Sequence, residues 1–359
     1  LGFRLQIKNL FVVYTGVIVS MCQSFDFALS HSHGDYIATL GDDDAVMYCY
    51  RPLVDEHFLI HPDQPLTWYR QAYFWNDSPL NPGLCMGLPW SPPAEISIHE
   101  KLELLRTHSV SYNDLPNIYN SFFPKSHYSA IRDFNLLNFS NSSIYPHKQC
   151  IAADIYTSIQ SAYLLSSSKY YLLNSPITIS GISARSNGVA VQASDSPDTE
   201  LNLFLSESGY NSFSDFTSKY LFKTDSVQAF NAAIQASAHS SFSHILSLPD
   251  WKPTLPWIVN LVQSYLSCEA NNYPQFASQY ISFLSSIDPK HQLLDYLLPY
   301  TSHSISSTKN KSTDESLMTY RDFFNLNNSP PSKPSMIDLR RYGCLNSCQS
   351  VIYYHNYYR

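Results

Sequence analysis

The pattern of apolar and polar positions divides the chain into a first half that alternates strands with helices and a second half of helices alone. Short apolar runs bounded by Pro, Gly or Asn predict strands at 66–69, 72–75 and 176–180. Apolar residues recur at helical spacing in 21–33, 45–58 and 95–107, and again after residue 152. This alternation indicates an α/β fold with a mixed sheet flanked by helices.

The stretch 36–40 organises this first half. It is apolar on both faces, which is typical of a buried parallel strand, and Gly41 permits a sharp turn directly after it. Three adjacent acids follow, Asp42, Asp43 and Asp44. Their carboxylates repel one another, and a hard divalent cation such as Mg²⁺ or Mn²⁺ would relieve that repulsion. The alternative is an Asp-rich turn that caps the next helix, because Asp is a favoured N-cap residue.

The second half shows helical periodicity with Phe, Leu, Ile and Tyr on one side and Ser, Gln or Asn on the other. The predicted helices are 212–222, 226–238, 255–268, 273–287 and 291–300. We therefore expect an α/β region at 1–190, a polar linker at 194–198 and a helical accessory region at 199–301. Residues 302–335 are polar and rich in Pro and Asn, so we expect 302–359 to be an irregular or disordered tail.

The segments 20–29, 33–37 and 41–44 together resemble family 2 glycosyltransferases, the inverting sugar transferases of GT-A fold. The resemblance implies a Rossmann-like mixed sheet and a DxD signature. By this resemblance Asp42 and Asp44 hold Mg²⁺ or Mn²⁺, while Asp42 and Asp43 contact the diphosphate of a nucleotide-sugar donor. The acceptor would be a hydroxyl of a glycan, a lipid-linked sugar or another molecule. The strands that cradle the nucleotide base in this family have no match here, so we expect the N-terminal nucleotide-binding strands to be missing.

Two later segments extend the resemblance, which ends near Gly188 and covers about half the chain. In this family an acid at the start of a late helix removes the proton of the attacking hydroxyl, and Asp154 matches that position. The alternative for Asp154 is a helix cap, and one residue can serve both roles. The family also shares a Gly-x-Ser-x-x-Ser loop, which begins here at Gly181, and within it Ser183 and Arg185 are candidate phosphate ligands.

Further candidates for ligand contact lie between these segments. Trp75 matches an aromatic position of the family, where stacking on a sugar or base and simple core packing are equally good explanations. Lys125, His127 and Arg132 are candidates for phosphate contact, although a solvated helix face accounts for such residues more often.

Composition narrows the classes of partner. Charged residues make up 14% of the 359 residues, against roughly a quarter in ordinary soluble proteins, and the net charge is −7. This balance argues against nucleic acid as a partner.

The seven cysteines lack the spacing of a metal site or a disulfide framework, which favours a reducing, cytoplasmic location. The apolar stretch 10–21 is too short to span a bilayer. Because the chain begins at Leu1, we expect further residues before it.

Three functions remain open at this point. The first is a metal-dependent inverting glycosyltransferase. The second is a truncated, non-catalytic remnant of such an enzyme or a carbohydrate-binding protein. The third is a metal-dependent phosphohydrolase that uses the same acids, which would need further ligands; the nearest are His31 and His33, and their positions suit the end of a helix better.

Overall fold

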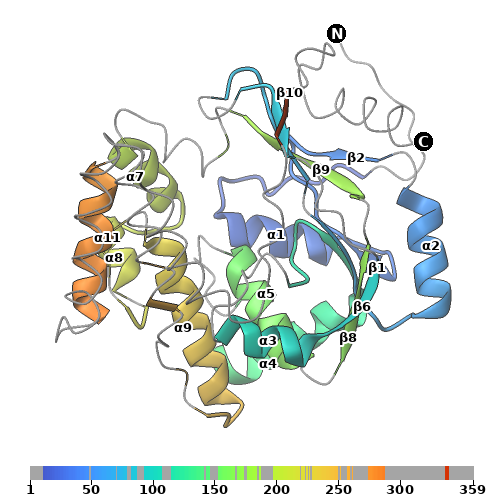
Figure 1. The fold of residues 1–359 in the computed structure, drawn as a ribbon. Coiled ribbons are helices and arrows are strands. Elements are labelled where there is room, and N and C mark those ends of the chain that lie inside the picture. Colours follow the sequence, from blue (N-terminus) through green and yellow to red (C-terminus); the bar gives the residue numbers. More distant parts are fainter. Residues whose placement is uncertain are drawn as a thin grey trace, which may run out of the picture.

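In the part of the chain that the structure describes, two five-stranded mixed sheets are flanked by helices, with a group of further helices on one side (Figure 1). The computed structural model describes residues 11–47, 50–69, 71–78, 82–86, 93–106, 115–140, 143–145, 153–165, 168–173, 176–183, 186, 197–218, 220–222, 224, 226, 229–249, 251, 257–258, 261, 274–287 and 336–338. Within these residues the architecture is α/β, as the sequence predicts.

The first sheet has the strand order β1-β7-β3-β8-β6, and the second has the order β10-β5-β4-β9-β2. Each contains one parallel pair, β3 with β8 and β4 with β9, and its other pairs are antiparallel. The strands of the first sheet are β1 (Tyr36–Ile37), β3 (Leu66–Trp68), β6 (Ala94–Ser97), β7 (Ser121–Pro124) and β8 (Lys169–Leu173). Those of the second are β2 (Ala45–Val46), β4 (Gln71–Phe74), β5 (Leu84–Met86), β9 (Thr178–Ile182) and β10 (Met336–Asp338).

The two sheets are joined because β4 follows β3 and β9 follows β8 after only a few residues. The parallel pair β3–β8 of the first sheet is therefore followed along both chain segments by the parallel pair β4–β9 of the second. The indole N–H of Trp68 donates to Thr178 Oγ1 at 2.9 Å across this junction, and both side chains are buried. Two segments about a hundred residues apart in sequence are thus fixed side by side.

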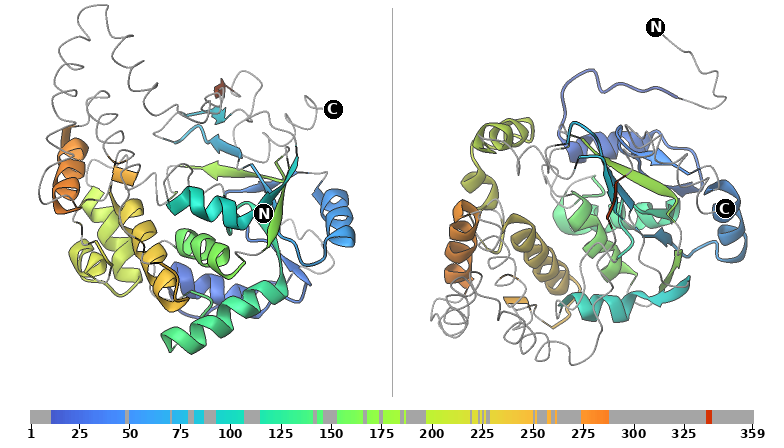
Figure 2. Two further views of the ribbon diagram at one scale, coloured as in Figure 1. Left: turned by 60° about the horizontal axis from the view of Figure 1, so that its bottom comes forward. Right: turned by 45° about the horizontal axis from the view of Figure 1, so that its top comes forward.

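Helices cover both faces of the first sheet. Figure 1 shows α2 on one side of the sheet and α1, α3, α4 and α5 on the other, and the views in Figure 2 agree. These helices are α1 (Met21–Ser30), α2 (Tyr50–Ile60), α3 (Ile98–Arg106), α4 (Lys125–Phe139) and α5 (Ala153–Leu164). Ser20 and Gln23 form a capping box at the start of α1, each side chain accepting from the other residue's backbone N–H.

Of the other helices that the structure describes, α7 (Pro197–Glu207), α8 (Phe213–Thr217) and α9 (Phe230–Ile245) share the hydrophobic core of the first half, whereas α11 (Pro274–Ile287) packs in a second cluster. Phe242 of α9 contacts the rings of Tyr156 and Tyr163 of α5, with centroids 6.2 and 6.0 Å apart. The second cluster, which includes Trp251, Trp257 and Phe283, lies within the helical region.

Several local predictions need correction. The run 36–40 is a two-residue strand that pairs antiparallel with β7, and Leu40 is exposed. The predicted helix 45–58 is instead β2 followed by α2, with Pro52 in the first turn of α2, where its missing N–H costs no hydrogen bond. The expected linker 194–198 overlaps the start of α7. The predicted helix 291–300 lies outside the described residues. Of the expected irregular tail 302–359 the structure describes residues 336–338, which form β10 and pair with β5.

Candidate functional site

The acidic triplet forms a tight loop between β1 and β2, held by hydrogen bonds to Asp44. Both carboxylate oxygens of Asp44 accept from backbone N–H groups: Oδ2 from Gly41 at 2.9 Å and Oδ1 from Gly181 at 3.0 Å. Gly181 belongs to β9, which pairs with β2 immediately after the loop. Asp44 therefore fixes the loop to the second sheet.

Asp43 joins the loop to the segment that follows β9. Ser186 Oγ donates to Asp43 Oδ2 at 2.9 Å, and it accepts from the backbone N–H of Ser183 at 3.0 Å. Burial raises the pKa of Asp43, the Ser186 hydrogen bond opposes that shift, and the negative charges of Asp44 and Asp42 raise the pKa further. The loop thus concentrates negative charge, a setting that attracts a cation.

The fit between loop and strand requires glycine at position 181. A Cβ atom there would lie 1.9 Å from the backbone oxygen of Asp43 and 2.8 Å from Nε1 of Trp75. Any side chain would therefore push the acidic loop away from the strand. Trp75 Nε1 is buried and has no hydrogen-bond partner among the described residues. An unpartnered indole N–H beside the loop is a donor that a ligand oxygen or a water could satisfy.

The expected metal ligands, Asp42 and Asp44, differ in their surroundings. Asp42 is exposed, whereas Asp44 uses both oxygens in backbone contacts. In the part of the chain that the structure describes, no group of three or more His, Cys, Asp or Glu side chains is arranged to hold a metal. Mg²⁺ is commonly bound by one or two carboxylates together with substrate phosphates, and each carboxylate oxygen of Asp44 keeps a second lone pair. The donors present fit an ion shared with a phosphate ligand.

Asp154 belongs to a different element from the acidic loop, Gly181 and Ser186. It is in the first turn of α5, where its side chain is half-buried, and its backbone oxygen accepts from Ser158 Oγ at 2.7 Å. This position suits a residue that interacts with the first-turn N–H groups of a helix. Its assignment as a general base stays a prediction.

The other predicted phosphate ligands have separate positions. Ser183 is 7% exposed, with its hydroxyl 3.4 Å from that of Ser186, so it supports the turn more than it faces solvent. Arg185 lies outside the described residues. His127 is wrong as a phosphate contact, because its side chain is buried against Phe123 and its Nε2 lies 3.1 Å from Ser161 Oγ. Burial lowers the pKa of His127 to about 4, which keeps it neutral at pH 7.

Two contacts of the site could not be assigned from sequence. Gly181 and Ser186 stand at the ends of the Gly-x-Ser-x-x-Ser run, so the motif itself was visible, but nothing in it indicates that Asp43 and Asp44 are its partners. Those pairs are separated by 137 and 143 positions in the chain. The signal that could have found them is the excess of small polar residues directly after a buried strand.

Comparisons with known proteins found no match for the chain: no protein-family model matches it, and no curated protein matches it. Among the described residues, no helix has the length and apolar character needed to cross a membrane.

Proposed function

We propose that this protein is a metal-dependent inverting glycosyltransferase with a GT-A-like catalytic region. The observation that carries the proposal is the hydrogen-bonded cluster of Asp43 and Asp44 with Gly181 and Ser186. Two segments that resemble motifs of the same enzyme family, far apart in the chain, thus meet at one place. A chance resemblance at either segment gives no reason for the two to be in contact.

In this proposal the donor is a nucleotide sugar, and its diphosphate lies at the acidic loop. Asp42 and Asp44 would hold Mg²⁺ or Mn²⁺, which neutralises charge on the departing diphosphate. Asp43, fixed by Ser186, keeps the loop in place, and the unpartnered N–H of Trp75 is available to a ligand oxygen. Asp154 would accept the proton of the acceptor hydroxyl, which makes that oxygen a stronger nucleophile.

A second candidate is a non-catalytic protein that retains the fold of such an enzyme. Both oxygens of Asp44 accept backbone N–H groups, and Asp43 accepts the hydroxyl of Ser186. These bonds give two of the three acids a structural role that needs no metal. The exposed Asp42 therefore separates the two candidates, because its side chain makes no such hydrogen bond among the described residues.

Calorimetry with nucleoside diphosphates, in Mn²⁺ and in chelator, tests the metal. We expect binding only with the metal, and we expect Asp42→Asn to weaken it by about tenfold or more, since a bound carboxylate oxygen becomes a neutral amide. The control Asp63→Asn removes an exposed acid elsewhere and should leave binding unchanged. Equal binding in metal and chelator would remove the metal from the proposal. The absence of binding in both conditions would support the non-catalytic candidate.

Asp154→Asn tests the general base. Turnover should fall by roughly 10²–10⁴-fold, the usual contribution of general-base catalysis, while nucleotide binding stays normal. Asn caps a helix nearly as well as Asp does, so the unfolding temperature should not change. Near-normal turnover in this variant would show that Asp154 is a helix-terminus residue without a catalytic role.

A further inference from the structure

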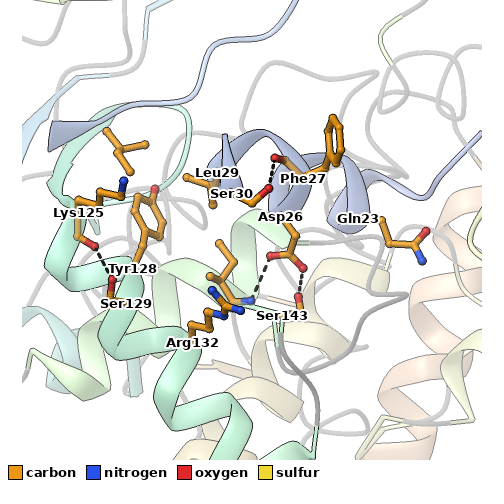
Figure 3. Close-up of a pocket in the computed structure, with 12 residues that line it drawn as sticks. Gln23, Asp26, Phe27, Leu29, Ser30, Lys125, Tyr128, Ser129, Arg132 and Ser143 are labelled. Atoms are coloured by element: carbon orange, nitrogen blue, oxygen red, sulfur yellow. Dashed lines mark hydrogen bonds between the residues drawn. The ribbon is translucent and has the colours of Figure 1, made fainter. Parts of the chain in front are cut away.

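A pocket with a volume of about 470 Å³ lies between α1 and α4, in the helix layer that covers the first sheet (Figure 3). Its size is in the range of small-molecule sites, roughly 300–1,000 Å³. Phe27, Leu29 and Ile37 supply apolar wall, and Lys125 and Arg132 supply positive charge. None of the acids of the candidate active site lines it.

The positive charges come from one face of α4. Lys125 and Arg132 are seven residues apart, about two helical turns, with Ser129 between them on the same face. Lys125 Nζ is anchored, because it donates to the backbone oxygen of Ser32 at 2.7 Å. This contact holds the ammonium group at the end of α1 instead of leaving it free in solvent.

One acid faces these cations across the pocket. The carboxylate of Asp26, on α1, accepts from the backbone N–H of Ile144 at 3.1 Å and from the hydroxyl of Ser143. Lys125, Arg132 and Asp26 are the charged groups of the lining, which leaves one net positive charge. The pocket therefore favours an anion over a neutral or cationic ligand.

A further polar group of the lining lacks a partner. Tyr128 is 4% exposed, it extends from α4 toward α1 beside Lys125, and its hydroxyl makes no hydrogen bond among the described residues. A buried hydroxyl without a partner is costly and rare, so a ligand oxygen or a water is the expected partner. The unsatisfied group and the two cations belong to the same α4 wall.

We propose that the α1–α4 pocket binds a small organic phosphate monoester. Ammonium, guanidinium and hydroxyl donors spread along α4 suit the three free oxygens of a phosphate group, whereas a carboxylate offers two oxygens to a single Arg fork. The apolar wall of Leu29 and Ile37 receives the organic part of the molecule. The inference does not depend on the proposed function, because it involves neither the acidic loop nor a metal.

Calorimetry in the presence of chelator tests the proposal with inorganic phosphate, phenyl phosphate and benzoate on the full chain. We expect phenyl phosphate to bind saturably, more tightly than inorganic phosphate and than benzoate. Arg132→Gln should weaken phenyl phosphate by about tenfold or more, because a charge-assisted hydrogen bond is lost. Arg51→Gln is the matched control: it removes an exposed arginine of α2, outside the pocket, and should bind as the wild type does.

Tyr128→Phe gives a second, independent result. It should weaken phenyl phosphate while leaving the unfolding temperature of the free protein equal or higher, since an unsatisfied buried hydroxyl is removed. Asp42→Asn should bind phenyl phosphate normally, which separates this site from nucleotide binding at the acidic loop. No saturable binding of either phosphate probe, equal binding by Arg132→Gln and the wild type, or benzoate binding at least as tight as phenyl phosphate would each overturn the proposal.

Discussion

At the scale of single residues, the position of each polar side chain on α4, and not its residue type, decides whether it lies at the pocket or in the core. Lys125, His127 and Arg132 all carry nitrogen donors, and all three were plausible phosphate contacts by sequence. The helix places Lys125 and Arg132 at the pocket and turns His127 inward, against Phe123 and Ser161. Burial then keeps the imidazole neutral, so its role is to fill space and form a hydrogen bond inside the core.

The lowered pKa of His127 makes stability depend on pH. Between about pH 6.5 and 4 the unfolded chain binds a proton at this side chain and the folded protein does not, so the free energy of unfolding falls as pH falls. Below about pH 4 both states are protonated and this contribution stays constant. The loss is at most about 3 kcal/mol. Burial also lowers the pKa of His57, which acts in the same direction.

Urea unfolding from pH 7.5 to 4 checks this prediction. In His127→Gln the decrease in unfolding free energy over that range should be smaller than in the wild type by about the same 3 kcal/mol. The control is His31→Gln, which replaces an exposed histidine. Identical profiles for His127→Gln and the wild type would contradict the assignment of a neutral buried histidine.

At the scale of elements, the junction of β9 with the acidic loop decides whether the candidate site exists. The loop approaches β9 so closely that the backbone oxygen of Asp43 occupies the space of a side chain at position 181. The parallel pairing of β9 with β4 sets this position, because Gly181 pairs with Tyr73 in the register. Strand register, loop conformation and the hydrogen bonds of the site are therefore coupled.

Gly181→Ala tests this coupling. The added methyl group must displace the loop, so we expect the free energy of unfolding to fall by about 1–3 kcal/mol, the usual cost of overpacking. Metal-dependent nucleotide binding should weaken in the same variant. Gly34→Ala is the comparison: its added Cβ would lie 3.1 Å from the backbone oxygen of Tyr36, a tight contact but a much milder one, so we expect a smaller loss of stability. A Gly181→Ala protein as stable as the wild type would mean that the loop does not need its contact with β9.

At the scale of the whole molecule, the helical region completes a core that begins in the first half. The largest cluster of buried residues joins α5 and its neighbours to α7, α8 and α9. Polar contacts support the same interface: the hydroxyl of Tyr163 lies 2.8 Å from Ser243 Oγ and 3.2 Å from Nδ1 of His239. The two regions therefore share buried surface, although α9 and α11 also enclose a cluster of their own.

Expression of residues 1–190 alone tests this shared core. Without α9 the faces of Tyr156 and Tyr163 on α5 are uncovered, so the fragment should bind hydrophobic dyes and aggregate. The full chain is the control and should elute as a defined species by size-exclusion chromatography. A 1–190 fragment that is soluble, monomeric and cooperatively folded would show that the helices form a separate domain.

The sequence by itself determined the α/β class, three of the described strands and the approximate positions of several helices. Alternation and helical spacing are local signals, so 66–69, 95–107 and 176–180 were recognised within a few residues of β3, α3 and β9. The same signals failed at 36–40 and 45–58. A short apolar run does not show whether its partner is parallel or antiparallel, and Pro52 stands in the first turn of a helix instead of breaking one.

Only the tertiary structure decided which of the candidate residues meet. Sequence marked the acids and the Gly-x-Ser-x-x-Ser run separately, but the pairing of β9 with β2 brings Gly181 and Ser186 to Asp44 and Asp43. The packing of α4 also places the side chain of His127 in the core and those of Lys125 and Arg132 at the lining of a pocket. Contacts over such separations depend on strand pairing and helix packing across the whole chain, whereas sequence periodicity reports only on neighbours along it.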